Sequence, residues 1–252
     1  MDLKFSVVTV CFNAEKEIKK TLNSVLTQSF SPYEYLIVDG KSKDKTVEIA
    51  ESFRSKFIEK GINYKITSEV DTGIYNAMNK GIRTAEGDFI SFLNAGDWYQ
   101  PDALLKINRF YQNESFDLTY GGLNYIVPNG ETVVKMSKLD RFPVTSRNWN
   151  HPSMFLRKSI YQKQGFDESF PAYADFHLYL KLRKAGIKIR VIPEIITNFV
   201  ADGVSTNVNF SKVLSRASEK YRAYRENGYC RFYWFESYGW EIIKMLYFRL
   251  KS

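Results

Sequence analysis

Short apolar runs alternate with polar, helix-compatible runs along the first hundred residues, and this alternation constrains the fold more than any other feature of the sequence. The apolar runs are rich in β-branched and aromatic residues, which favour strands. Strands are predicted over residues 4–11, 33–39, 62–68 and 88–94, and helices over 14–28, 43–57 and 73–85. Largely apolar strands that alternate with helices indicate an α/β fold, in which helices cover both faces of a mainly parallel sheet.

The second half of the chain is less regular. Pro101 opens a predicted helix at its first position. The other predicted elements are strands over 117–127 and 131–136, a strand that leads into a short helix over 151–165, a helix over 174–186 and a strand over 187–193. Residues 101–208 are therefore expected to add a small antiparallel region to one α/β domain over residues 1–208.

The last part of the chain, residues 209–252, is predicted to be a helical extension with two helices that flank Gly228. Residues 211–252 contain nine Lys or Arg, four Asp or Glu and eleven aromatic residues. Three interpretations fit this composition. The aromatic side chains could pack on the main domain, lie on an anionic membrane with the basic groups near phosphates, or stack on single-stranded nucleic acid.

Composition sets limits on the partner and the compartment. A net charge of +8 favours an acidic partner, but it does not choose among nucleic acid, anionic lipid and a phosphorylated substrate. Cys11 and Cys230 lie far apart in the sequence and match no metal-binding spacing. A secreted protein would usually carry an evenly paired set of cysteines, so these two fit a reducing compartment. The N-terminal apolar run is far shorter than the ~18 residues of a membrane span and lacks the pattern of an export signal. We therefore expect a cytoplasmic protein.

Three common site types can be set aside. Gly40-Lys41-Ser42 resembles the end of a P-loop, but Tyr35 stands where the first glycine of that loop is needed. No G-x-G-x-x-G follows the first strand, which argues against a dinucleotide-binding oxidoreductase. His151 and His177 have no neighbouring cysteine and no H-E-x-x-H context, so a zinc site is not expected.

Carboxylates recur where the predicted parallel strands end. Asp39, Asp71 and Asp97 each follow a strand, and ligands of such sheets bind beyond the carboxyl ends of the strands. Each residue alone could be a helix cap or a loop residue. Together they suit a nucleotide, because one carboxylate can accept from a base or ribose and another can hold a divalent cation between two phosphates.

Three long ordered stretches are informative together: FSVVTVCFNAEKEIKKTLNSVLTQSFSPYEYLIVDGKSKDKT, DTGIYNAMNKGIRTAEGDFISFLNAGDWYQPDAL and HPSMFLRKSIYQKQGFDESFPAYADFHLYLKL. They resemble the family 2 glycosyltransferases of the GT-A fold. The group that builds bacterial cell-surface polysaccharides is the most similar. The resemblance implies a nucleotide-sugar-binding half over 1–100 and an acceptor-side half over 101–208, with the segment 202–206 near the mouth of the site.

The resemblance also implies a donor site. Phe12 would lie against the base, Asp39 would pair with uracil, and Asp71 would lie near the phosphates. The full predicted nucleotide-binding set is Val10, Phe12, Asn13, Asp39, Asp71, Gly73 and Asn79. A UDP-sugar is the donor that this set favours.

The acidic motif of the family holds Mn²⁺ or Mg²⁺ on the donor diphosphate, and here only Asp97 keeps its carboxylate. The family commonly has two aspartates, whereas Asn94, Ala95 and Gly96 precede Asp97 in this chain. Asn94, Gly96 and His151 are candidate contacts to the diphosphate or the acceptor. One carboxylate together with diphosphate oxygens and water could still complete a Mg²⁺ shell.

Asp175 matches the family's catalytic base, which implies transfer with inversion to a hydroxyl of a saccharide or a lipid-linked saccharide. A peripheral position on the inner face of the cytoplasmic membrane through residues 211–252 is a further expectation. Nucleic acid is not an expected partner. Two rivals remain: a sugar nucleotidyltransferase, which would need a glycine-rich basic loop where CFNAEKE stands, and a catalytically silent nucleotide-sugar binder.

Overall fold

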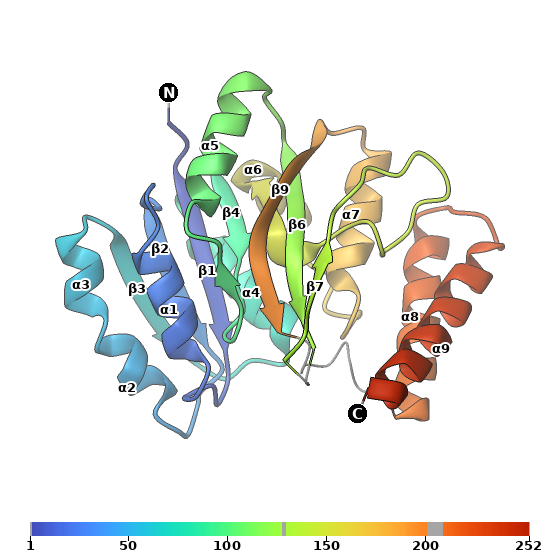
Figure 1. Ribbon diagram of the computed structural model, residues 1–252, viewed down its shortest axis with the longest axis horizontal. Coiled ribbons are helices and arrows are strands. Elements are labelled where there is room, and N and C mark those ends of the chain that lie inside the picture. Colours follow the sequence, from blue (N-terminus) through green and yellow to red (C-terminus); the bar gives the residue numbers. More distant parts are fainter. Residues whose placement is uncertain (1, 128–129, 201–208, 252) are drawn as a thin grey trace.

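The strands form one nine-stranded sheet in the computed structural model, which describes residues 2–127, 130–200 and 209–251 (Figure 1). Their order is β3-β2-β1-β4-β8-β6-β9-β5, and β7 pairs with β6. The strands are β1 (Phe5–Cys11), β2 (Glu34–Asp39), β3 (Asn63–Ser68), β4 (Phe89–Phe92), β5 (Trp98–Tyr99), β6 (Leu118–Ile126), β7 (Thr132–Lys135), β8 (Met154–Arg157) and β9 (Ile189–Val200).

The first four strands in space, β3-β2-β1-β4, are all parallel, as the sequence predicted. The helices between them are α1 (Ile18–Leu26), α2 (Thr46–Glu51), α3 (Arg54–Glu59) and α4 (Ile74–Thr84). Alternate residues of β1 point to opposite faces: Val8 and Val10 pack in one core cluster with α4, while Phe5 and Val7 pack in another with α1 and α3. The α/β fold with both faces of the sheet covered is therefore confirmed.

The second half of the chain extends the same sheet. Strand β8 is antiparallel to β4 and β6, but β6 and β9 are parallel to each other. The helices of this half are α5 (Ala103–Asn113), the short 3₁₀ helix η1 (His151–Ser153), α6 (Lys158–Gln164) and α7 (Ala174–Lys184). Strand β9 continues well past the predicted end at residue 193, and its far end pairs with β5, a strand that the sequence pattern did not predict.

The helix predicted over residues 43–57 is wrong as one element, because it divides into α2 and α3. At the break, the backbone N–H of Phe53 donates to the carbonyl of Ala50, and the Ser52 hydroxyl donates to the Ile49 carbonyl at 2.7 Å. This tight turn lets both Phe53 and Phe57 lie in the core. A local hydroxyl that competes for a helix carbonyl is the physical reason.

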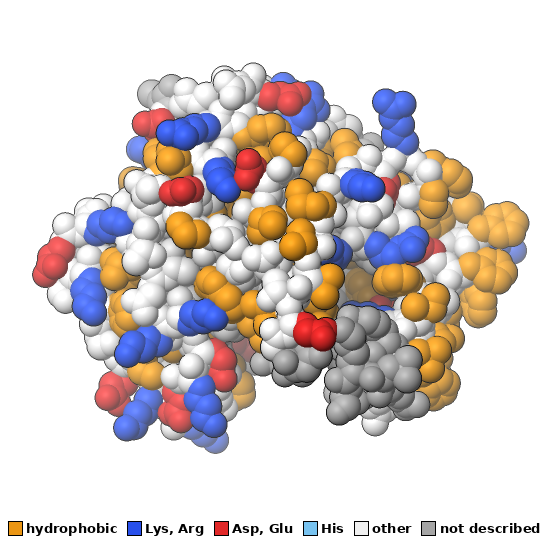
Figure 2. Space-filling model, viewed as in Figure 1, with side chains coloured by type: hydrophobic (Ala, Val, Ile, Leu, Met, Phe, Trp, Pro, Cys, Tyr) orange, Lys and Arg blue, Asp and Glu red, His pale blue; other side chains and the backbone are white. Residues whose placement is uncertain are grey.

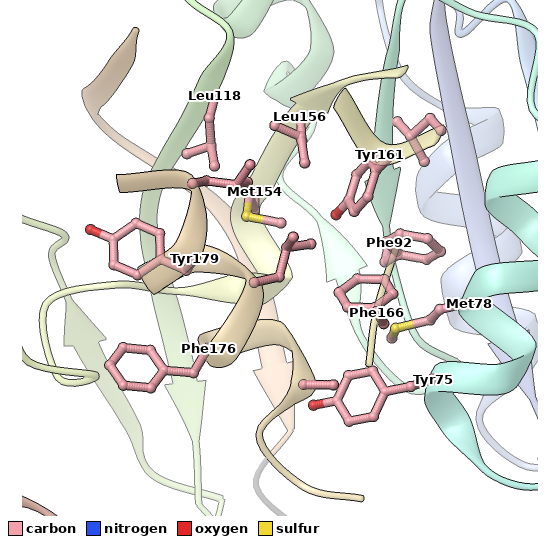
Figure 3. Packing of buried hydrophobic residues seen from close by; sticks show 14 of the residues in the cluster. Tyr75, Met78, Phe92, Leu118, Met154, Leu156, Tyr161, Phe166, Phe176 and Tyr179 are labelled. Atoms are coloured by element: carbon pink, nitrogen blue, oxygen red, sulfur yellow. The ribbon is translucent and has the colours of Figure 1, made fainter. Parts of the chain in front are cut away.

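The main core lies between the sheet and the helices α4, α6 and α7. Figure 3 shows Tyr75 and Met78 of α4 facing Phe92 and Phe166. The rings of Phe92 and Phe166 meet edge to face with centroids 5.6 Å apart. This packing holds α4 and the segment between α6 and α7 against β4.

The two predicted C-terminal helices are α8 (Phe210–Glu226) and α9 (Tyr233–Lys251), and they lie side by side next to α7 (Figure 1). Tyr224 and Tyr233 are buried in the main core cluster, so part of the aromatic content packs on the domain. In the described part of the chain, no helix is long and apolar enough to cross a bilayer. The segment 202–206 lies outside the described residues.

Candidate active site

The loops that follow β1 and β2 are joined by Asn13. Its backbone N–H donates to the Ser42 hydroxyl at 2.8 Å, and its side-chain oxygen accepts from the N–H of Lys43 at 2.9 Å. Asn13 has a left-handed backbone with φ of +49°, which asparagine tolerates better than most residues. The predicted role of Asn13 in nucleotide binding remains a prediction, and its observed contacts hold the two loops together.

Asp39 lies at the carboxyl end of β2 and is almost completely buried. Its carboxylate accepts from the Ser42 N–H at 3.0 Å and from the Ser68 hydroxyl at 2.5 Å. The thiol of Cys11 is 3.7 Å from the same carboxylate, and burial, with a contribution from Asp39, raises the pKa of that thiol far above its usual value. A polar, preorganised carboxylate thus stands where β1, β2 and β3 end.

Phe12, Asp71 and Gly40 come together beside this carboxylate. The Phe12 side chain is 60% exposed at the end of β1. A Cβ on Gly40 would lie 2.5 Å from a carboxylate oxygen of Asp71 and 3.3 Å from the Phe12 ring. Gly40 is a site residue that the sequence reasoning missed, because the glycine was considered only as part of a P-loop. The signal was an Asp-Gly pair directly after a parallel strand.

Asp71 also organises the start of α4. Its carboxylate accepts from the N–H of Gly73 at 3.0 Å, and Gly73 has φ of +142°, which glycine adopts without strain. The N–H groups at the start of a helix attract anions, and here the Asp71 carboxylate accepts from one of them. The structure therefore brings the predicted residues Phe12, Asp39, Asp71 and Gly73 to one edge of the sheet.

Two predicted nucleotide-binding residues have other contacts. The Val10 side chain is buried in the main core, and its carbonyl accepts from the N–H of Ala95. The Asn79 amide donates to the Phe166 carbonyl at 3.0 Å and to Glu168 at 2.8 Å. Asn79 thus secures the segment before α7, and a nucleotide contact by either residue remains a prediction.

Asp97 lies in the loop between β4 and β5, and it is 4% exposed. One of its carboxylate oxygens accepts from the N–H of Val200 at 3.0 Å, which ties the loop to the end of β9. Gly96 has φ of +101°, so this turn needs a glycine. The side-chain oxygen of Asn94 is buried and has no hydrogen-bond partner among the described residues.

The described residues contain no group of three or more His, Cys, Asp or Glu side chains that could hold a metal ion. A buried carboxylate at Asp97 and an unsatisfied amide oxygen at Asn94 are both hard oxygen ligands, the type that Mg²⁺ and Mn²⁺ accept. These residues fit a cation that takes its other ligands from a donor diphosphate and water.

Asp175 lies in the first turn of α7 and pairs with His151 of η1. The distance between Nδ1 of His151 and Oδ2 of Asp175 is 3.3 Å. The imidazole stacks on the ring of Trp149, with centroids 5.8 Å apart and planes inclined by 25°, and its Nε2 has no partner among the described residues. Burial lowers the pKa of His151, and the nearby Asp175 opposes that shift. The pair thus joins two predicted residues that the sequence could not connect.

The end of β9 connects the two halves of the candidate site. Val200 donates to Asp97, and the Thr197 hydroxyl donates to the carbonyl of Pro152 at 2.8 Å, next to His151. Strand β9 therefore bonds both to Asp97, the predicted metal ligand, and to the segment that carries His151, the partner of the predicted general base Asp175.

A known protein family and several known proteins match large parts of the chain. The model for Glycosyl transferase family 2 matches residues 6–180. A PGL/p-HBAD biosynthesis glycosyltransferase of Mycobacterium bovis is 31% identical over 159 residues, which cover 62% of this chain and 60% of that protein. The chondroitin synthase of Pasteurella multocida is 24% identical over 208 residues, or 81% of this chain and 21% of that protein. The match thus spans about 60% of the length of the mycobacterial relative.

Two solved structures show the same fold. TarS of Staphylococcus aureus, residues 1–349 in complex with UDP, aligns with a TM-score of 0.63 and 22% identity over 95% of this chain and 71% of that one. The mannosyltransferase PcManGT from Pyrobaculum calidifontis, in complex with GDP-Man and Mn²⁺, aligns with a TM-score of 0.66 and 15% identity over 100% of this chain and 75% of that one. The family model covers more than half of the chain, and the protein belongs to glycosyl transferase family 2.

Proposed function

We propose that the protein transfers a sugar from a nucleoside diphosphate donor, a UDP-sugar, to a hydroxyl of a saccharide or lipid-linked saccharide, with inversion. The observation that carries the proposal is the meeting of Asp39, Asp71 and the exposed Phe12 ring at one edge of the sheet. An aromatic face, the buried carboxylate of Asp39 and the half-buried carboxylate of Asp71 suit a nucleobase with N–H donors. The TarS structures with UDP and UDP-GlcNAc support a UDP-sugar donor.

In this proposal Asp175 is the general base. The acceptor hydroxyl loses its proton to the Asp175 carboxylate as its oxygen bonds to the anomeric carbon. The bond from that carbon to the diphosphate breaks on the opposite side, and the electron pair leaves with the nucleoside diphosphate. Configuration at the carbon is therefore inverted. The Asp175 side chain is 18% exposed, which leaves it accessible to an acceptor.

Asp97 and Asn94 would hold Mn²⁺ or Mg²⁺ together with the donor. A bound divalent cation would neutralise the charge that grows on the departing diphosphate. The residues of this chain contribute a buried carboxylate and a buried amide oxygen, and Gly96 keeps the loop free of a side chain near them.

A lipid-linked acceptor would bring the protein to a membrane surface, and the C-terminal helices support such a contact. Phe232, Trp234 and Phe235 are exposed around the start of α9, next to the exposed Arg231. Apolar side chains gather along this edge of the molecule in Figure 2. We infer that this surface, formed by Arg231, Phe232, Trp234 and Phe235, lies against anionic lipid headgroups.

The test separates donor binding from transfer. Wild-type protein and Asp175→Asn are screened by thermal shift with UDP, GDP, UDP-GlcNAc, UDP-glucose and GDP-mannose, each with and without Mn²⁺. Both proteins should be stabilised by the same uridine nucleotide, because a ligand that binds only the native state raises stability by mass action. Release of UDP from the matching UDP-sugar should fall about 100-fold or more in Asp175→Asn, since a general base contributes this much.

Near-normal turnover by Asp175→Asn would remove Asp175 as the base. A second candidate function, a nucleotide-sugar binder without catalysis, is favoured by the single carboxylate of the acidic motif. It predicts the same thermal shifts but no UDP release from wild-type protein under any of these conditions.

A further inference from the structure

The two residues that lead into the Asp175 turn are held by three other helices. Ala172 and Tyr173 directly precede α7, and Tyr173 is its N-cap residue. The Tyr173 side chain makes no cap hydrogen bond of its own. The N–H groups of both residues and the carbonyl of Ala172 bond to side chains of α4 and α8.

Glu219 of α8 provides the closest of these contacts. One of its carboxylate oxygens accepts from the N–H of Ala172 at 2.7 Å and from the N–H of Tyr173 at 2.6 Å. Two consecutive N–H groups that converge on one anionic oxygen form a rigid arrangement, and bonds to a charged acceptor are stronger than neutral ones. Glu219 lies 46 residues from Tyr173 in sequence, so only the folded structure brings them together.

The other two helices hold the same segment from different directions. The Tyr75 hydroxyl of α4 donates to the Ala172 carbonyl at 3.2 Å, and Figure 3 shows this side chain beside the segment that enters α7. The Tyr173 hydroxyl donates at 2.6 Å to Glu241 of α9, which also forms a buried ion pair with Arg216 of α8 at 3.0 Å. The segment therefore has little freedom to shift.

A second contact from α8 reaches the loop a few residues earlier. The Arg222 guanidinium donates to the Ser169 carbonyl at 2.7 Å and stacks over the Phe170 ring at 3.7 Å from its centroid. Burial raises the pKa of Glu219, with a smaller contribution from Asp175, while the two N–H bonds and Arg222 favour the charged form. A half-buried carboxylate is costly to retain, which suits a positioning role better than simple packing.

We propose that the C-terminal helices α8 and α9 position the catalytic base, with Glu219 as the positioning residue that fixes the backbone in front of Asp175. This inference rests on the proposed role of Asp175. It assigns the helical extension a part in catalysis that is separate from any membrane contact. A misplacement of about 1 Å at a reacting group can reduce the rate by about 100-fold, so the contact matters even though Glu219 touches no substrate.

The experiment compares Glu219→Ala and Glu219→Gln with a control on the same helix, Lys212→Ala. The Lys212 side chain is exposed and forms no hydrogen bond or ion pair with the described residues. Release of nucleoside diphosphate is measured from UDP-GlcNAc, UDP-glucose and GDP-mannose with Mn²⁺. Hydrogen exchange at the amides of residues 172 and 173 is measured on the same proteins.

For Glu219→Ala we expect kcat to fall about tenfold or more, while the donor KM stays within about twofold and the two amides exchange faster. The kcat of Glu219→Gln should lie between those of Glu219→Ala and wild type, because the amide oxygen of glutamine can still accept the two N–H bonds. The control should match wild type in all three measurements. An unchanged kcat in Glu219→Ala, or an equal loss in the control, would overturn the proposal. If Glu219→Ala does not fold, the same criteria apply to Glu219→Gln.

The double variant Asp175→Asn with Glu219→Ala separates this inference from the proposed function. If both hold, the double variant is no slower than Asp175→Asn, because there is no base left to position. If only the positioning role is wrong, Asp175→Asn is slow and Glu219→Ala is normal. If the base assignment is wrong, Asp175→Asn turns over normally, whatever the exchange of the two amides shows.

Discussion

At the scale of single residues, Asp97 has two tasks that one substitution can separate. Its carboxylate accepts from Val200, and in the proposed function it also holds a divalent cation. Asp97→Asn keeps an acceptor oxygen for Val200 but loses the charge, so the stability of the free protein should change little. We expect the Mn²⁺-dependent part of the thermal shift with UDP to vanish and sugar transfer to fall about 100-fold, since metal stabilisation of the leaving group contributes several kcal/mol. An Mn²⁺ titration after EDTA treatment that matches wild type would remove the metal assignment.

At the scale of elements, the helix pair α8 and α9 depends on buried charges. The Lys220 ammonium is completely buried and lies 2.8 Å from Glu236, whose carboxylate also accepts from Tyr224 at 3.1 Å. Burial lowers the pKa of Lys220, and Glu236 opposes this. Glu236→Gln leaves that charge buried without its counter-ion and should lower the free energy of unfolding by about 3 kcal/mol. Urea unfolding measures the free energy of unfolding of each variant. Glu226→Gln, which affects the 3.5 Å contacts of an exposed carboxylate with Arg222 and His177, should cost under about 1 kcal/mol. Equal effects of the two substitutions would contradict the argument.

At the scale of the whole molecule, exposed aromatics and basic residues favour a membrane-facing edge. Phe232 and Phe235 are 78% and 67% exposed, and Ile58, on α3 at the opposite end of Figure 1, is 59% exposed. In cosedimentation with phosphatidylglycerol vesicles at low salt, the variant Phe232→Ser with Phe235→Ser should bind at least about tenfold more weakly than wild type, because two apolar contacts are lost. Ile58→Ser should bind like wild type. Wild-type protein that stays in the supernatant would rule out this contact.

Much of the N-terminal half could be predicted from the sequence, because its signals are local. Alternating apolar runs define β1 to β4, and the residue after each strand must lie at the same edge of a parallel sheet. Asp39 and Asp71 are at that edge, as expected. The division of residues 43–57 into two helices depended on one hydroxyl, at Ser52, which helix periodicity does not register.

The sequence by itself determined the order of strands and helices, the family and the edge of the sheet that carries the carboxylates, since these follow from periodicity and short motifs. Only the tertiary structure decided that Gly40 lets Phe12 and Asp71 meet, that His151 pairs with Asp175, and that Glu219 holds the backbone before α7. Each of these contacts joins residues far apart along the chain. Their approach depends on how whole elements pack, and no local pattern of residue types encodes that distance.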